Sequence, residues 1–161
     1  MRKIFVLVLF LAVLKPLGAS SDKFITEQQI ILSTHLYRQR EQDKEIRKRI
    51  AIIKAIEWVE SRHNTYAHNK GEDARGVLQI RSIMVKEVNQ LGHLYTHQDA
   101  WDYNKSISMF TKYQNKFNPT WDAELAAKKW NGGREGEKKL STQEYWERVE
   151  VKFNELFSNE V

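Results

Sequence analysis

A long stretch without helix-breaking residues most constrains how this chain can fold: residues 24–59 contain no glycine and no proline. Such a composition is typical of a helix. At 100° per residue, the apolar side chains near the end of the stretch fall on one broad face: Ile52, Ala55, Ile56 and Val59. The pattern therefore predicts a helix whose last turns bury this face in a core.

Glu60 follows at the edge of this apolar face, in the last turn of the predicted helix, between Ile53 and Ile56 on the helical wheel. A carboxyl group set against apolar side chains is harder to ionise, so its pKa rises. A general acid that works near neutral pH needs such a raised pKa. Glu57 lies with Lys54 on the opposite side, and we expect it to face water as an ordinary carboxylate. Glu60 is therefore the candidate catalytic acid.

The rest of the chain predicts short helices separated by turns. Residues 61–75 are polar and indicate a loop, and residues 76–80 indicate a short strand or a turn. Further helices are expected at residues 82–91, 101–117, 119–130 and 142–157, the third with Asn118 as its cap and Pro119 as its first residue. We predict a mainly α single domain with at most one small β-hairpin.

Three short motifs occur in order along the chain: Glu60-Ser61, Gly76-Val77-Leu78-Gln79 and Trp130-Asn131. Together they resemble the lytic transglycosylase domains of the soluble type, a glycoside hydrolase family 23-like branch of the lysozyme superfamily. Those domains have a catalytic Glu-Ser at a helix end, a Gly-x-x-Gln turn and an aromatic-Asn pair on a later helix. The resemblance covers roughly residues 46–155 and implies a lysozyme-like fold.

The resemblance also implies an activity. The substrate would be the glycan strands of peptidoglycan, cut at the β-1,4 bond between N-acetylmuramic acid (MurNAc) and N-acetylglucosamine (GlcNAc). Glu60 would act first as general acid and then as base, leaving 1,6-anhydro-MurNAc ends. One carboxyl group suffices for this reaction, whereas most glycosidases use two. No cofactor is implied.

Site roles follow from the same resemblance. Ser61 would buttress the site beside Glu60, Gln79 would border the sugar cleft, and Asn131 would contact an acetamido group. Trp130 replaces the usual tyrosine; an indole can stack on a sugar, but it has no hydroxyl group to bond the catalytic carboxylate.

Each motif also has a structural interpretation. Ser61 could form ordinary helix-end hydrogen bonds, and Asn131 could cap a helix before Gly132. We expect Val77 and Leu78 to be core residues and Gly76 to be required by a tight turn. Two later residues, Tyr145 and Val149, match the family's C-terminal Tyr-x-x-x-Val helix, which we interpret as a packing feature.

Two alternatives remain open. Goose-type lysozymes share the helical core and place aspartates in the loop that here contains Asp73, where they activate water. A hydrolytic muramidase of this kind would release a reducing sugar, although the interpretation of Asp73 that we favour is a loop acid that caps a turn. The second alternative is a non-catalytic cell-wall-binding or scaffolding protein that kept the groove.

Residues 1–20 have the pattern of a secretory signal peptide: Arg2 and Lys3, an apolar run over residues 4–14, then small residues up to Ser20. We expect export to the periplasm or cell envelope, with no membrane anchor left after cleavage. Residues 1–20 contain three basic and no acidic residues, so the formal charge falls from +5 to +2 without them. This small charge does not support nucleic-acid binding.

The predicted organisation is a signal peptide (1–20), a helical arm of mixed charge (21–45), the lysozyme-like domain (46–155) and a C-terminal tail (156–161). The chain has no cysteine, and its histidines show no helical zinc-binding pattern, so we predict no metal site. We expect a monomer. Wall remodelling and local opening of the wall for an envelope-spanning machine are both compatible with the sequence.

Overall fold

The computed structural model describes residues 27–158, so the predicted signal peptide and the first part of the predicted arm lie outside the described residues. The chain divides into two compact units between Arg38 and Gln39, and each is described by itself. In the first unit, the described residues are all helical and belong to α1 (Glu27–Ser61). This helix continues into the second unit, so the predicted boundary between residues 45 and 46 falls inside a continuous helix.

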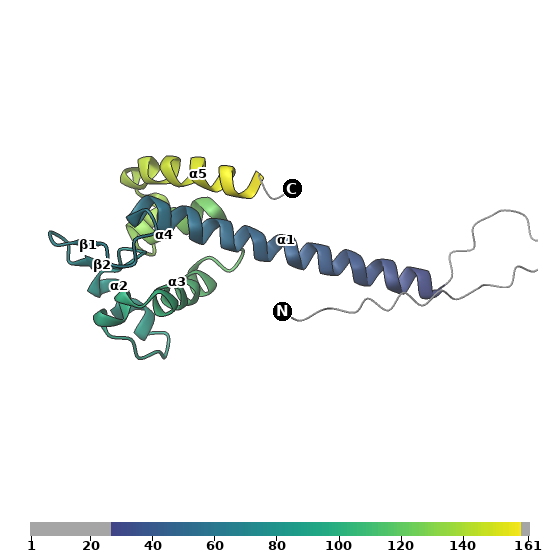
Figure 1. The fold of residues 1–161 in the computed structure, drawn as a ribbon, viewed down its shortest axis with the longest axis horizontal. Coiled ribbons are helices and arrows are strands. Elements are labelled where there is room, and N and C mark those ends of the chain that lie inside the picture. Colours follow the sequence, from purple (N-terminus) through teal and green to yellow (C-terminus); the bar gives the residue numbers. More distant parts are fainter. Residues whose placement is uncertain (1–26, 159–161) are drawn as a thin grey trace, which may run out of the picture. The chain divides into compact units, whose positions relative to one another are not determined.

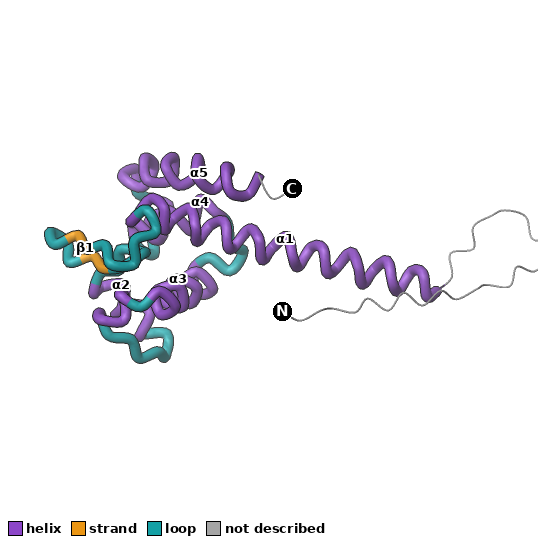
Figure 2. The backbone as a smooth tube through the Cα atoms, in the orientation of Figure 1, coloured by secondary structure: helices purple, strands orange, loops and turns teal. Residues whose placement is uncertain are grey.

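The second unit is mainly helical, as predicted (Figures 1 and 2). After α1 come a two-stranded antiparallel hairpin of β1 (His68–Asn69) and β2 (Ala74–Arg75), then α2 (Ser82–Asn89), α3 (Tyr103–Phe117), α4 (Ala123–Gly132) and α5 (Gln143–Ser158). Three 3-10 turns connect the helices, at His97–Trp101, Gly136–Lys138 and Leu140–Thr142. No helix in the described part is long and apolar enough to cross a membrane.

The predicted apolar face of α1 forms part of the core, since Ile52, Ala55 and Ile56 are fully buried. Aromatic rings from α3 and α4 fill much of the remaining space. The ring of Phe110 meets that of Trp130 edge-on, with centroids 4.8 Å apart, and Tyr113 contacts the same indole at 5.9 Å. These contacts fix α4 against α3.

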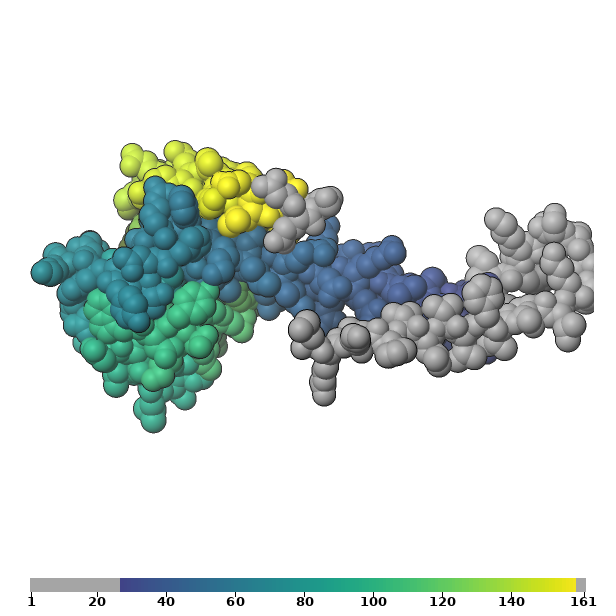
Figure 3. Space-filling model, in the orientation of Figure 1, coloured from purple at the N-terminus to yellow at the C-terminus, as the bar shows by residue number. Residues whose placement is uncertain are grey.

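α5 lies along the C-terminal part of α1, as Figures 1 and 3 show. Its buried side chains include Tyr145 and Val149, in agreement with the predicted packing of this helix. On the outside, the ammonium group of Lys152 lies 4.7 Å from the ring centroid of Trp58 on α1. This cation–π contact joins the two helices at the surface.

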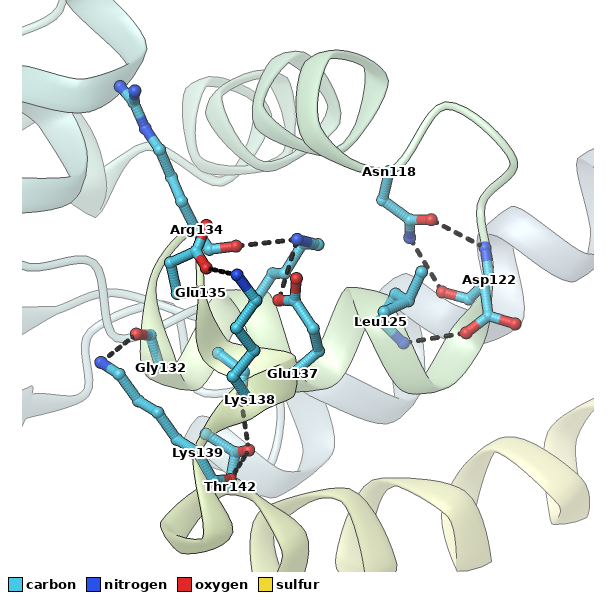
Figure 4. Close-up of polar contacts among 12 residues, drawn as sticks. Asn118, Asp122, Leu125, Gly132, Arg134, Glu135, Glu137, Lys138, Lys139 and Thr142 are labelled. Atoms are coloured by element: carbon cyan, nitrogen blue, oxygen red, sulfur yellow. Dashed lines mark hydrogen bonds and ion pairs between the residues drawn. The ribbon is translucent and has the colours of Figure 1, made fainter.

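The predicted start of the fourth helix is wrong. α4 begins at Ala123, and Asp122 is its N-cap, with a side chain that accepts a hydrogen bond from the Leu125 amide at 2.9 Å. Asn118 instead ends α3, and its buried amide group bonds both the carbonyl oxygen and the amide nitrogen of Asp122 (Figure 4). Trp121 has a φ of +49°, which a right-handed helix does not allow, so the helix starts only after it.

A tight turn at residues 76–79 follows the hairpin. The Gly76 amide donates to the Ala67 carbonyl at 2.9 Å, and the Gln79 amide donates to the Gly76 carbonyl at 3.1 Å. Gly76 has a φ of +74°, and a Cβ atom there would lie 1.8 Å from the carbonyl oxygen of Ala100. The turn therefore requires glycine for two reasons, backbone conformation and space.

We predict that Gly76→Ala lowers the free energy of unfolding by more than about 2 kcal/mol, since it combines left-handed strain with a backbone clash. Two matched variants separate these causes. Gly92→Ala has the positive φ but no atom within 4 Å, and Gly71→Ala has only an ordinary contact at 3.4 Å. Urea denaturation should show the largest loss of stability for Gly76→Ala, a smaller loss for Gly92→Ala and the smallest for Gly71→Ala. A Gly76→Ala protein as stable as Gly71→Ala would contradict the description of the turn.

Candidate active site

A cleft of about 600 Å³ lies between the end of α1, the hairpin, α2 and α4. Four of the residues proposed from the sequence line it: Glu60, Gln79, Trp130 and Asn131. The fold thus brings the three motifs, which are far apart along the chain, to one concave surface. Such a surface, with a few polar groups converging on it, is the usual setting of a ligand site.

Glu60 is in the last turn of α1, partly buried, with its carboxyl group largely shielded from water. Burial raises the pKa of Glu60 from 4.5 to about 7, against the lowering effects of a hydrogen bond from Tyr145 and the positive charges of Arg81 and Arg148. The nearby carboxylate of Glu72 adds a smaller upward contribution. A pKa near 7 leaves both the acid and its conjugate base populated at neutral pH, as acid–base catalysis requires.

Tyr145 has a role that the sequence analysis missed. Besides packing, its hydroxyl group donates a hydrogen bond to Glu60 Oε1 at 2.7 Å, across 85 residues of sequence. It therefore supplies the hydroxyl group that Trp130 lacks. The Tyr-x-x-x-Val pattern marked the helix, but only the fold shows that its tyrosine reaches the carboxyl group.

Trp130 lines the cleft but is only 5% exposed. Its indole nitrogen donates to the Leu78 carbonyl at 3.2 Å, and its ring packs between Phe110 and Tyr113. The indole therefore connects the third motif to the turn of the second motif and forms the floor of the cleft.

Ser61 connects the first motif to the same turn. Its hydroxyl group donates to the Val77 carbonyl at 2.8 Å, and the carbonyl of Glu57 lies at 3.3 Å. Since a hydroxyl group has one hydrogen to donate, Ser61 is committed to this structural contact. It does not line the cleft. Val77 and Leu78 are fully buried, as predicted.

Gln79 lines the cleft with an unusual backbone, since its φ is +47°. Its side-chain nitrogen donates to the carbonyls of Ala67 and Gly76, at 3.0 and 2.9 Å. Both amide hydrogens are thus used within the protein. The side-chain oxygen, which has no partner in the described part of the chain, remains an acceptor for a ligand.

Asn131 is exposed in the last turn of α4 and lines the cleft. The interpretation of Asn131 as a helix cap is wrong, because α4 extends to Gly132 and Gly133 is the C-cap. The ammonium group of Lys139 donates to the Gly132 carbonyl at 2.6 Å and closes this wall of the cleft (Figure 4).

Asp73 does not line the cleft. Its carboxylate accepts two hydrogen bonds from Arg75, at 2.9 and 3.0 Å, and contacts His68 at 3.0 Å. The bonds from Arg75 and His68 lower the pKa of Asp73. The neighbouring residue, Glu72, lines the cleft instead, with Arg81 3.9 Å away.

The expectation that Glu57 faces water is wrong. Glu57 is fully buried, and its carboxylate contacts Lys54 at 2.9 Å, Tyr103 at 2.9 Å and His63 at 2.9 Å. The helical wheel placed Glu57 opposite the apolar face, but the first residue of α3 and the turn after α1 cover that side. The carboxyl group is hydrogen-bonded there, because the Lys54 ammonium group and the Tyr103 hydroxyl group donate to its oxygens. No group of three metal-binding side chains lies together within the described residues.

The helical fold and the cleft define a lysozyme-like domain. The sequence model described as Transglycosylase SLT domain matches residues 35–152, more than half of the chain. The protein therefore belongs to the SLT transglycosylase family, which confirms the resemblance seen in its motifs. Comparisons with curated proteins and with solved structures gave no match.

The raised pKa of Glu60 predicts a measurable effect on stability. Because the folded protein holds this proton more tightly than the unfolded chain, the stability contributed by the neutral carboxyl group is lost as pH rises from about 4.5 to about 7. When the pH is raised from 4 to 8, the free energy of unfolding of Glu60→Gln should therefore rise by up to about 3 kcal/mol relative to that of the wild type. Urea denaturation at the two pH values measures this difference.

The exposed Glu150→Gln variant on α5 is the matched control for the loss of one carboxyl group. A stability difference between Glu60→Gln and the wild type that stays constant with pH would show that Glu60 ionises as readily in the folded protein as in the unfolded chain.

Proposed function

We propose that this protein is a peptidoglycan lytic transglycosylase in which Glu60 is both the general acid and the general base. Members of the SLT family act on peptidoglycan, which supports the substrate class. The observation that most directly supports the mechanism is the shielded Glu60 carboxyl group, bonded to Tyr145 at 2.7 Å and facing a cleft shared with Gln79 and Asn131.

The hydrogen bond from Tyr145 decides where the proton of neutral Glu60 lies. Since Oε1 accepts from the tyrosine hydroxyl group, the carboxylic proton is on Oε2. Transfer of this proton to the bridging oxygen lets the bond between that oxygen and C1 of MurNAc break. The GlcNAc side leaves as an alcohol, and positive charge develops at C1 and the ring oxygen. The neighbouring N-acetyl oxygen stabilises this charge.

The second step restores the enzyme. The Glu60 carboxylate takes the proton of the C6 hydroxyl group of the same MurNAc, and the C6 oxygen bonds to C1. The product is a 1,6-anhydro ring, no water is consumed, and Glu60 is protonated again. A pKa near 7 suits both halves of this cycle, because the acid form and the carboxylate form of Glu60 are both populated at neutral pH.

The polar groups of the cleft have matching roles in this proposal. The free side-chain oxygen of Gln79 accepts a hydrogen bond from the sugar, and the exposed amide group of Asn131 bonds an acetamido substituent. Trp130 presents a small part of its indole to the sugar and holds the turn of Gln79 in place.

A hydrolytic muramidase of the same fold is the second candidate, and one observation favours it. Glu72 lines the cleft beside Glu60 and so offers a second carboxylate to activate water. Asp73 is less suited to this task, because it is held by Arg75 and His68 outside the cleft. In the hydrolytic case the product carries a reducing end.

We further propose that the protein acts in the periplasm or cell envelope as a monomer, after removal of residues 1–20. The pattern of those residues and the peptidoglycan substrate of the family support this location.

Purified protein and Glu60→Gln, each incubated with isolated cell-wall sacculi, test the proposal. The wild type should release soluble muropeptides with anhydro ends, which mass spectrometry identifies by the loss of one water. Glu60→Gln should lose at least about 1000-fold in rate, since the glutamine side chain has no acidic proton to give to the leaving oxygen. The exposed Glu150→Gln variant controls for purification and folding.

Products with reducing ends would favour the hydrolase, and Glu72→Gln would then have to abolish their release. Equal release by the wild type and Glu60→Gln would remove Glu60 from the mechanism. Sacculi that are bound but not cut by either protein would favour the non-catalytic scaffold.

A further inference from the structure

Arg81 lies in the same cleft as Glu60 and has no role in the reaction as described so far. It follows the core residue Ile80 and occupies the N-cap position of α2, where its backbone has an extended conformation and its side chain makes no capping bond. The side chain is 44% exposed. Its position is thus fixed by the backbone, while the guanidinium group remains accessible from the cleft.

The guanidinium group of Arg81 has few of its donors in use. Its ion-pair partner in the described part of the chain is Glu72, at 3.9 Å, which is too long for a hydrogen bond. Lys139, another cation in the cleft, already donates to the Gly132 carbonyl at 2.6 Å. A guanidinium group presents five donors in a planar fork that matches a carboxylate. Arg81 is therefore suited to bind an anionic group of a ligand in the cleft.

Arg81 is also close enough to the reacting carboxyl group for its charge to lower the pKa of Glu60. A ligand group bound by Arg81 would consequently lie near the bond that is cut. In peptidoglycan, the N-acetyl group on C2 of MurNAc is neutral, and the nearest substituent that can carry a negative charge is the lactyl group on C3. Its carboxyl group is free in peptide-stripped strands, and in peptide-bearing strands it is joined to a stem peptide that has carboxylates of its own.

We propose that Arg81 is a specificity-determining residue that binds a carboxylate of the MurNAc substituent. The inference rests on the proposed peptidoglycan substrate. A bound carboxylate replaces the loose pairing with Glu72 by two direct hydrogen bonds. A neutral glycan offers no such replacement, so Arg81 makes the cleft favour strands that carry a negative charge at MurNAc. Arginine, with its fork, performs this role better than lysine.

Binding in the Glu60→Gln background tests the proposal without any cleavage of the strands. Soluble uncross-linked glycan strands would be titrated by calorimetry in three forms: peptide-stripped with free lactyl carboxylates, peptide-stripped with those carboxylates converted to methylamides, and peptide-bearing. The variants Arg81→Gln and Arg81→Lys are compared with Lys112→Gln, which removes one positive charge from a residue outside the cleft. Circular dichroism checks that the overall helix content of each variant is unchanged.

Arg81→Gln should weaken binding of at least one carboxylate-bearing strand by about tenfold, with a smaller loss for Arg81→Lys, and should leave methylamide strands unaffected. A loss confined to stripped strands assigns the lactyl carboxylate, and a loss confined to peptide-bearing strands assigns a stem-peptide carboxylate. Lys112→Gln should bind all three forms like the parent.

An equal loss on methylamide strands would overturn the proposal, as would unchanged binding of every strand or no binding by the parent. Strands that are bound through Arg81 but never cut by the wild type would instead contradict the proposed function and leave this inference standing.

Discussion

The site depends on one carboxyl group that the fold shields from water but does not neutralise with a partner charge. Burial raises the pKa of Glu60, and the hydroxyl group of Tyr145 limits the rise to about 7. A full ion pair would have kept the group ionised, as the contacts of Asp73 do. Complete burial without the tyrosine would have kept it neutral. The balance between these two effects gives Glu60 the properties of both an acid and a base.

The geometry around Glu60 is fixed by the turn of the second motif. Ser61 and Trp130, from the first and third motifs, donate to two consecutive carbonyls of this turn, those of Val77 and Leu78. Gly76 allows the turn to pass against the Ala100 carbonyl. These bonds hold three segments that are far apart in the sequence together around one cleft.

The sequence predicted the features that depend on local periodicity and on motifs. It predicted the buried face of α1, the position of Glu60 at the edge of that face, and the glycine at residue 76. It failed where a distant segment supplied the partner. Glu57 is buried by Tyr103 from α3, and Tyr145 reaches Glu60 from α5. The predicted start of α4 at Pro119 was wrong, because the Asn118 side chain bonds the backbone of Asp122 where helical backbone bonds were expected. A helical wheel shows neither tertiary contacts nor hydrogen bonds between a side chain and the backbone of a neighbouring turn.

The most direct test of this account is the ionisation of Glu60 itself, followed by NMR through the chemical shift of its side-chain carboxyl carbon as pH is varied. The account predicts a midpoint near pH 7 in the wild type and a higher midpoint in Tyr145→Phe, because the hydrogen bond that lowers the pKa is then lost. Tyr95→Phe, which loses a hydroxyl group bonded to Ser108 instead, should leave the midpoint unchanged. A midpoint near 4.5 in the wild type would contradict the account, since Glu60 would then be an ordinary carboxylate.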